Sequence, residues 1–202
     1  MPASKTQIVN LALQRIGVSK QVANVDTENS KEAMNAKTAY DDERDYVLRD
    51  FPWPFATKYV APGLVAGSST VAANLDWNYS YRYPSDAVYV RRILSALGRN
   101  DPDPPPFKVG RDDQGRLIYT NQAEAQIEYT MRVTNPEEFD PLFVSAFAWR
   151  LGWVLAPSLS RVEKIADHCL KMYAIELSKA QAGAGNEQQQ EKQIEAEWIR
   201  GR

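Results

Sequence analysis

Four acidic residues close together are the first side chains in this sequence that could do chemistry. The cluster consists of Asp41, Asp42, Glu43 and Asp45. Two carboxyl groups held a fixed distance apart can hydrolyse a glycosidic bond, and several can bind a divalent cation. A run of acids on a helix is usually a solvated face, and nothing here gives two of these acids different pKa values. We therefore predict an exposed helix face, with hydrolysis of a glycosidic bond as the alternative.

The chain has a single histidine and a single cysteine, the neighbours His168 and Cys169. A thiol and an imidazole in contact form a nucleophilic pair. Neighbouring side chains on a helix point in different directions, so these two are not expected to meet. A metal site of four ligands would need carboxylates or other subunits to complete it. We therefore predict no catalytic residue, no cofactor and no metal site, and a buried Cys169.

The sequence also gives little support for nucleotide binding or for nucleic-acid binding. Gly63, Gly67 and Gly98 are scattered, and none precedes a Lys-Ser or Lys-Thr pair at the start of a helix. The chain has 24 Lys and Arg against 26 Asp and Glu, so its formal charge of -2 gives no overall basic field. A group of basic residues could still touch DNA phosphates or an acidic partner, or serve solubility alone: Arg91, Arg92, Arg99, Lys108, Arg111 and Arg116. A DNA-binding accessory protein is the weaker alternative.

Helices dominate both ends of the chain. Apolar residues at helical spacing predict helices over 6–16, 30–51, 141–157 and 160–177. Asn29 or Ser30 caps the second, Asp140-Pro141 opens the third, and Ser160 with Glu163 forms a capping box for the last. No secretion signal is visible, and no stretch looks long enough for a membrane anchor. We expect a protein made and used in the cytoplasm, or in a particle assembled there.

A rigid elbow ends the second helix. It consists of Phe51, Pro52, Trp53, Pro54 and Phe55. Each proline removes an amide donor and pushes the preceding residue out of the helical region. The chain must bend here, and we predict that Trp53 and Phe55 are buried anchors.

Aromatic residues then alternate with polar ones in a row: Trp77, Tyr79, Tyr81 and Tyr83. Period two predicts a strand with one aromatic face. Such a face could be a packed sheet surface, a stacking platform for single strands or sugars, or a contact between subunits or with the tail; we favour the contact. Further strands are predicted at 87–94, at 107–109 and 117–119 around a tight turn, and at 127–133.

The C-terminal region reads as a hinge and a tail. Residues 180–185 are small and contain glycine, and the charged segment after them has three apolar residues at helical spacing, Ile194, Trp198 and Ile199. The full prediction is an α+β, mainly helical fold: a four-helix bundle from residues 1–74 and 135–180, a small antiparallel β-sheet inserted at 75–134, and a flexible C-terminal tail at 181–202.

Several short motifs occur in a characteristic order: Ala-Leu-Gln-Arg-Ile-Gly at 12–17, Glu-Ala at 32–33, Tyr-Asp at 40–41, Arg-Asp at 44–45, Leu48, Pro-Trp-Pro-Phe-Ala at 52–56, and Tyr-Arg-Tyr-Pro-Ser-Asp at 81–86. With this order the chain resembles the head-to-tail adaptors of short-tailed phages, often called tail tubular protein A, and their relatives in other tailed phages. The resemblance covers about residues 4–155.

The resemblance implies a structural protein of the virion, and it makes a virion-associated cell-wall (peptidoglycan) hydrolase the alternative for the acidic cluster. Identical subunits of such adaptors form a ring beneath the portal protein, usually a dodecamer, and the genomic DNA passes through without specific binding. The opposite side receives the tail or nozzle protein. The mobile C-terminal segment commonly docks onto the portal, which would assign that contact here to Ile194, Trp198 and Ile199.

Overall fold

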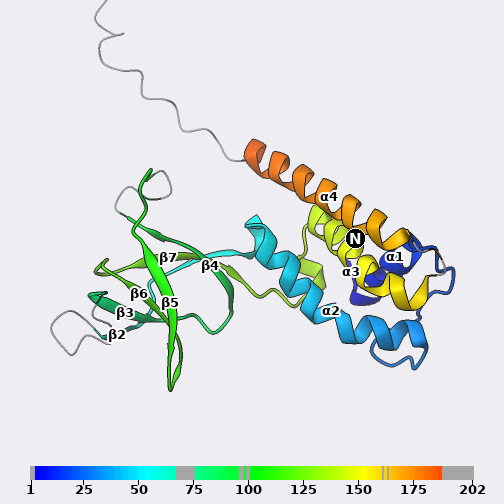
Figure 1. The fold of residues 1–202 in the computed structure, drawn as a ribbon, viewed down its shortest axis with the longest axis horizontal. Coiled ribbons are helices and arrows are strands. Elements are labelled where there is room, and N and C mark those ends of the chain that lie inside the picture. The colour runs from blue at the N-terminus through cyan, green and yellow to red at the C-terminus, as the bar shows by residue number, and fades with distance from the viewer. Residues whose placement is uncertain are drawn as a thin grey trace, which may run out of the picture.

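The computed structural model describes residues 3–66, 76–95, 98, 101–160, 162 and 164–187. These residues form a helical part and a β part that lie side by side (Figure 1). The described helices are α1 (Lys5–Arg15), α2 (Lys31–Asp50), α3 (Pro141–Leu159) and α4 (Ile165–Glu187). The described strands are β1 (Thr57–Val60), β2 (Leu64–Ala66), β3 (Tyr79–Arg82), β4 (Ala87–Leu94), β5 (Phe107–Asp112), β6 (Gly115–Thr120) and β7 (Gln126–Met131).

Helix α3 is the centre of the helical part. It is apolar nearly all round and packs against α1, α2 and α4. Gly152 lets α1 approach closely, because a Cβ atom there would lie 3.3 Å from the side chain of Ile16. Among the described helices, α3 alone is long and apolar enough to cross a membrane. Core helices of folded domains have the same length and composition, and α3 contacts three other helices.

Local signals fix where the helices begin. Ser4 and Gln7 form a reciprocal capping box at α1, and the Ser30 side chain accepts from the amide of Ala33 at α2. At α3 the Asp140 carboxylate accepts from the amide of Leu142, and Pro141 occupies the first turn. The predicted starts of α2 and α3 are therefore confirmed.

The β part consists of two antiparallel sheets rather than one. Their strand orders are β1-β7-β4 and β2-β3-β6-β5. Pro84 follows β3 and its carbonyl oxygen accepts from the amide of Ala87 in a turn, after which β4 starts in the other sheet. A cluster of apolar and tyrosine side chains fills the β part, separate from the core of the helical part.

The predicted fold class is therefore wrong. The described chain has four helices and two antiparallel sheets of seven strands in total, not a four-helix bundle carrying one small sheet. The sheet region was underestimated because β1 and β2 precede residue 75, and β1 pairs with the distant strand β7. The helices do not form a bundle because α1, α2 and α4 each pack on the central α3.

The C-terminal prediction also needs correction. Helix α4 continues to Glu187, so residues 181–187 are helical and not a hinge. Ala180 is buried in the helical core, and alanine favours helix, which outweighs the cost of the glycines. At the other end, α4 begins at Ile165, and Ser160 accepts from the amide of Val162. Glu163 of the predicted capping box lies outside the described residues, as do Ile194, Trp198 and Ile199.

Candidate functional site

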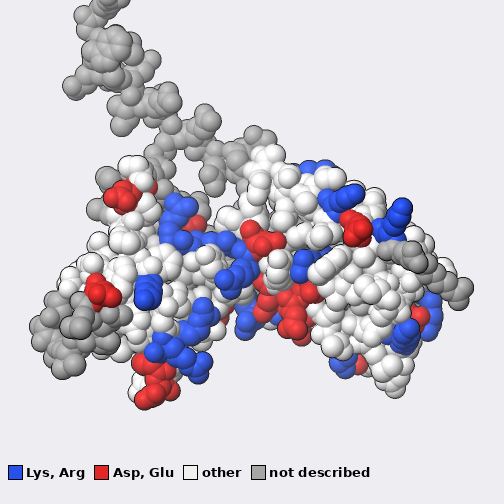
Figure 2. All heavy atoms as spheres, viewed as in Figure 1, with Lys and Arg blue, Asp and Glu red and all other residues white. Residues whose placement is uncertain are grey.

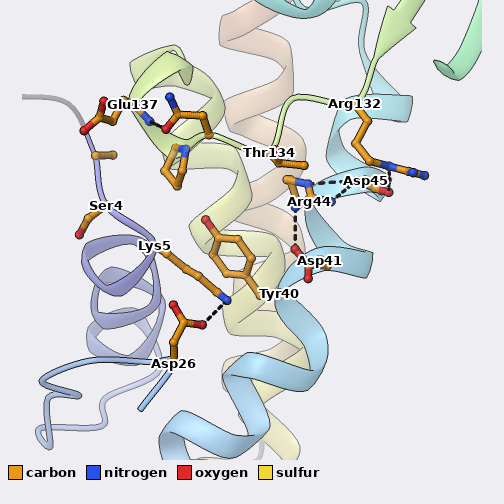
Figure 3. Close-up of a pocket in the computed structure, with 13 residues that line it drawn as sticks. Ser4, Lys5, Asp26, Tyr40, Asp41, Arg44, Asp45, Arg132, Thr134 and Glu137 are labelled. Carbon is orange, nitrogen blue, oxygen red and sulfur yellow. Dashed lines mark hydrogen bonds and ion pairs between the residues drawn. The ribbon is translucent and has the colours of Figure 1, made fainter. Parts of the chain in front are cut away.

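A large hollow lies at the joint between the helical part and the β part. This joint pocket has a volume of about 790 Å³. Figure 3 shows its walls, which come from the start of α1, the middle of α2 and the segment after β7. Its lining includes two members of the predicted acidic cluster together with residues from distant parts of the sequence: Ser4, Lys5, Asp26, Tyr40, Asp41, Arg44, Asp45, Arg132, Thr134 and Glu137.

Arginines bind the acidic cluster. The Arg44 side chain is only 6% exposed, and its guanidinium donates to Asp41 across 2.6 Å and to Asp45 across 2.7 Å. The second oxygen of Asp45 accepts from Nε of Arg132 at 2.7 Å (Figure 3). Asp45 therefore connects α2 to the segment that leaves β7.

Glu43 is bound in the same way on another side of α2. Nε of Arg150 in α3 donates to its carboxylate across 2.6 Å. The Arg150 guanidinium also stacks on the ring of Tyr46 at 3.8 Å. Three of the four predicted acids thus pair with arginines: Asp41 within α2, Asp45 also with Arg132 after β7, and Glu43 with α3. Asp42 is exposed.

Tyr40 forms the floor of the joint pocket. It is 1% exposed and packs edge-on against Phe147, with ring centroids 4.9 Å apart. Lys5 lies over its ring and pairs with Asp26 at 2.6 Å. Within the described chain the hydroxyl of Tyr40 has no hydrogen-bond partner, and burial raises its pKa. A phenol that keeps its proton cannot serve as a base at neutral pH.

Arg91 makes the second connection of the joint. Its Nη2 donates to the carbonyl oxygens of Leu48, Arg49 and Phe51 at 3.1, 2.7 and 3.0 Å, and its Nε donates to the hydroxyl of Thr130 at 2.9 Å. The last carbonyls of a helix have no partner within the helix. Arg91 supplies that partner from β4 and so attaches the end of α2 to the three-stranded sheet.

The elbow packs into the helical core. Trp53 is 1% exposed and Phe51 is 8% exposed, while Phe55 is partly buried against the same cluster. The ring of Trp53 meets that of Phe143 in α3 edge-on, with centroids 5.1 Å apart. Helix α2 ends at Asp50, directly before this segment, and β1 begins at Thr57. The elbow therefore directs the chain from the helices into the sheets.

The predicted aromatic row is mostly internal. Tyr81 and Tyr83 are buried in the core of the β part, and Tyr79 is partly buried beside them. Their packing corresponds to the sheet-surface alternative, which leaves little of these two rings for a partner. Trp77 is partly exposed and lies just outside β3. The contact prediction remains open for Trp77 and Tyr79.

The predicted basic group is divided among several surroundings. Arg91 is used at the end of α2, and Arg92 pairs with the buried Glu128 at 3.3 Å. Lys108, Arg111 and Arg116 are exposed on β5 and β6, and Arg99 lies outside the described residues. Figure 2 shows acidic and basic side chains side by side over the middle of the molecule, without a broad basic surface on this face.

His168 and Cys169 have separate surroundings. Cys169 is fully buried, and burial raises the pKa of its thiol. His168 is exposed and its ring meets that of Trp149 edge-on at 5.6 Å. Among the described residues, no group of three or more His, Cys, Asp or Glu side chains could hold a metal ion.

Sequence reasoning found the acids and the elbow but missed their partners. Arg44 stands between Asp41 and Asp45 in the sequence, and a basic residue inside an acidic run is a signal for such pairing. Arg91 and Arg132 come from distant strands, and no local pattern identifies them as partners of α2. No protein-family model matches this chain, and no curated protein shows significant similarity to it.

Proposed function

We propose that this chain is a head-to-tail adaptor subunit of a tailed phage, a structural protein that forms a ring under the portal and joins the capsid to the tail. The motif order described above suggests this role, and Pro-Trp-Pro-Phe at 52–55 forms the joint between the two parts of the fold. Such a subunit works by binding several partners at once, so it needs separate contact surfaces on a rigid body.

The observation that best supports the proposal is that apolar side chains are exposed on the edge strands of both sheets. Each edge strand of the two sheets bears an exposed large apolar side chain: Tyr59 on β1, Tyr89 on β4, Leu64 and Val65 on β2, and Val109 on β5. Exposed apolar side chains on such edges favour contact with other protein surfaces.

The joint supports the same role. Arg91 and Arg132 attach α2 to the β part, and Trp53 anchors the elbow in the helical core. Contacts made by the β part would therefore be transmitted to the helices without a loose linker.

Direct assembly tests the proposal. Purified protein mixed with portal rings of the same phage should yield a complex of higher mass, with a fixed number of adaptor chains per ring. Val109→Lys should weaken assembly because it places a charge at an apolar edge, whereas Met34→Lys, at an exposed position of α2, should not. Absence of any complex with the portal, while the protein is folded, would refute the adaptor role.

The C-terminal contact is proposed from the resemblance alone. Deleting residues 188–202 removes Ile194, Trp198 and Ile199 but leaves α4 intact. The shortened chain should fold and lose its attachment to the portal, as measured by co-sedimentation. Binding equal to that of the full chain would show that the portal contact lies elsewhere.

A further inference from the structure

A second hollow lies at the corner where the two sheets meet. This corner pocket has a volume of about 590 Å³. Its walls are the β1–β2 connection, the turn after β3, the end of the β5–β6 hairpin and Arg132. Three arginines line it, Arg82, Arg116 and Arg132, and no Asp or Glu is among its lining residues. Such a lining favours an anionic group.

Arg116 has N–H donors that no acceptor among the described residues uses. Its guanidinium stacks on the ring of Tyr83 at 3.7 Å, and none of the described residues forms an ion pair with it. Stacking occupies the face of a guanidinium and leaves the N–H groups at its edge free to donate. Arg111 stands directly opposite Arg116 in the β5–β6 pair, so two like charges share one face of the sheet. Like charges in this position are unfavourable, and an anion would relieve them.

The other two arginines are held in place by acids that lie outside the pocket lining. Arg82 donates to both oxygens of Asp112 at 2.8 and 3.1 Å. Arg132 donates to Asp45 through Nε and keeps its two terminal nitrogens for other acceptors. Side chains that are already fixed lose less conformational entropy when a ligand binds.

We propose that the corner pocket binds the carboxylates of an acidic peptide segment of a partner protein. Arginine recognises carboxylates through paired N–H donors, and the pocket brings three guanidinium groups around one hollow. This site does not depend on the adaptor role, because any acidic segment of suitable shape would satisfy it.

A protein segment fits the surroundings better than a nucleic acid does. A duplex presents a long row of phosphates and needs an extended basic surface. Here the net charge of the chain is -2, and two acids pair with the arginines, Asp112 with Arg82 and Asp45 with Arg132. Figure 2 shows red and blue spheres next to each other at the end of the β5–β6 hairpin. A short carboxylate side chain can enter the pocket without approaching all of these acids.

Fluorescence polarisation with labelled hexaglutamate tests the proposal at low salt. The full chain should bind the peptide, and Arg116→Gln should weaken binding by about fivefold or more, the loss expected for one charged hydrogen bond. Lys108→Gln is the matched control, since it removes one positive charge from an exposed position of the neighbouring strand, outside the pocket lining. It should change binding less than twofold.

A second variant keeps the test decisive if Arg116→Gln disturbs the fold. Ser85→Glu leaves every arginine in place and puts a carboxylate at the pocket wall, so it should abolish peptide binding. No binding by the unchanged protein, or equal losses in Arg116→Gln and Lys108→Gln, would overturn the proposal. Tighter binding of a 12-base-pair duplex than of hexaglutamate, with the same loss in Arg116→Gln, would identify a nucleic-acid site instead and would also overturn it.

Discussion

The indole nitrogen of Trp53 donates a hydrogen bond to the carbonyl oxygen of Val47 across 2.8 Å. The chain thus turns back, after Pro52, onto the helix that it has just left. The same indole ring packs edge-on against Phe51 and Phe143, with centroids 5.0 and 5.1 Å away. One side chain therefore fixes the elbow to both α2 and α3.

Two substitutions of Trp53 should distinguish the contribution of its hydrogen bond to stability from the contribution of its packing. Trp53→Phe keeps an aromatic ring but loses the donor to Val47, and it should lower the free energy of unfolding by about 1–3 kcal/mol. Trp53→Ala also opens a cavity and should cost about 3–5 kcal/mol. Urea unfolding measures both. Trp77→Phe, at a partly exposed position, should change stability by less than about 1 kcal/mol, and an equal loss there would contradict this account.

Arg91 gives the second prediction. Arg91→Ala leaves the carbonyl oxygens of Leu48 and Arg49 without the donor that Arg91 supplies, while that of Phe51 still accepts from the amide of Trp53. It should lower the free energy of unfolding by about 2–3 kcal/mol. Arg91→Lys keeps the charge but cannot span α2 and Thr130, and should recover less than half of the loss. Arg111→Ala, an exposed arginine on β5, is the control and should be nearly neutral in the same measurement. Full recovery by lysine would show that charge alone matters.

The sequence predicts the elements whose signals are local. Helix starts are predicted at Ser30 and at the pair Asp140-Pro141, because these residue types cap the first turn of a helix. A helix end is predicted by the prolines at 52 and 54. The turn at 112–115 is also predicted from its aspartate and glycine. In the structure Asp112 accepts from the amide of Gln114, and Gly115 takes a positive φ of 138°. Each of these predictions depends on a few neighbouring residues, so it can be made without knowing how the rest of the chain folds.

The remaining features depend on contacts between distant segments. Strand β1 has four residues and becomes a strand by pairing with β7, about 70 positions later. The division into two sheets follows from the pairing of β4 with β7 and of β3 with β6, and it changes the fold class. At the joint, the acids on α2 looked solvated because Arg132 and Arg150 are far from them in the sequence. In α4, burial of Ala180 overrides the flexibility that the nearby glycines suggest.

Asp45 should be the most sensitive member of the acidic cluster. Asp45→Asn removes the charge shared by Arg44 and Arg132, so we expect a loss of about 1–2 kcal/mol in the free energy of unfolding. Asp41→Asn is the matched control, because Asp41 also pairs with Arg44 but its side chain is 67% exposed. Its loss should be below about 1 kcal/mol. The reverse order of the two losses, by urea unfolding, would show that Asp45 does not connect α2 to the segment after β7.

Asp86 should make stability depend on pH in the acid range. Burial by itself would raise the pKa of this carboxyl, but hydrogen bonds from Lys58 at 3.0 Å and from the Tyr129 hydroxyl at 3.0 Å outweigh it, and the pKa lies below its usual value. The unfolded chain then binds the proton more readily than the folded one. The contribution of Asp86 is therefore complete above the ordinary aspartate pKa of about 3.9 and is lost as the pH falls below it.

Asp86→Asn isolates this effect. The amide keeps an acceptor for the Tyr129 hydroxyl but loses the ion pair with Lys58, so the variant should be less stable than the unchanged protein at pH 7. The difference should shrink between about pH 4 and pH 2, as measured by thermal unfolding, because acid removes the charge from the native carboxyl as well. Asp103→Asn, in the exposed proline-rich loop, controls for the general effect of losing one carboxylate. A stability difference that stays constant over this range would mean that Asp86 acts through its shape and not through its charge.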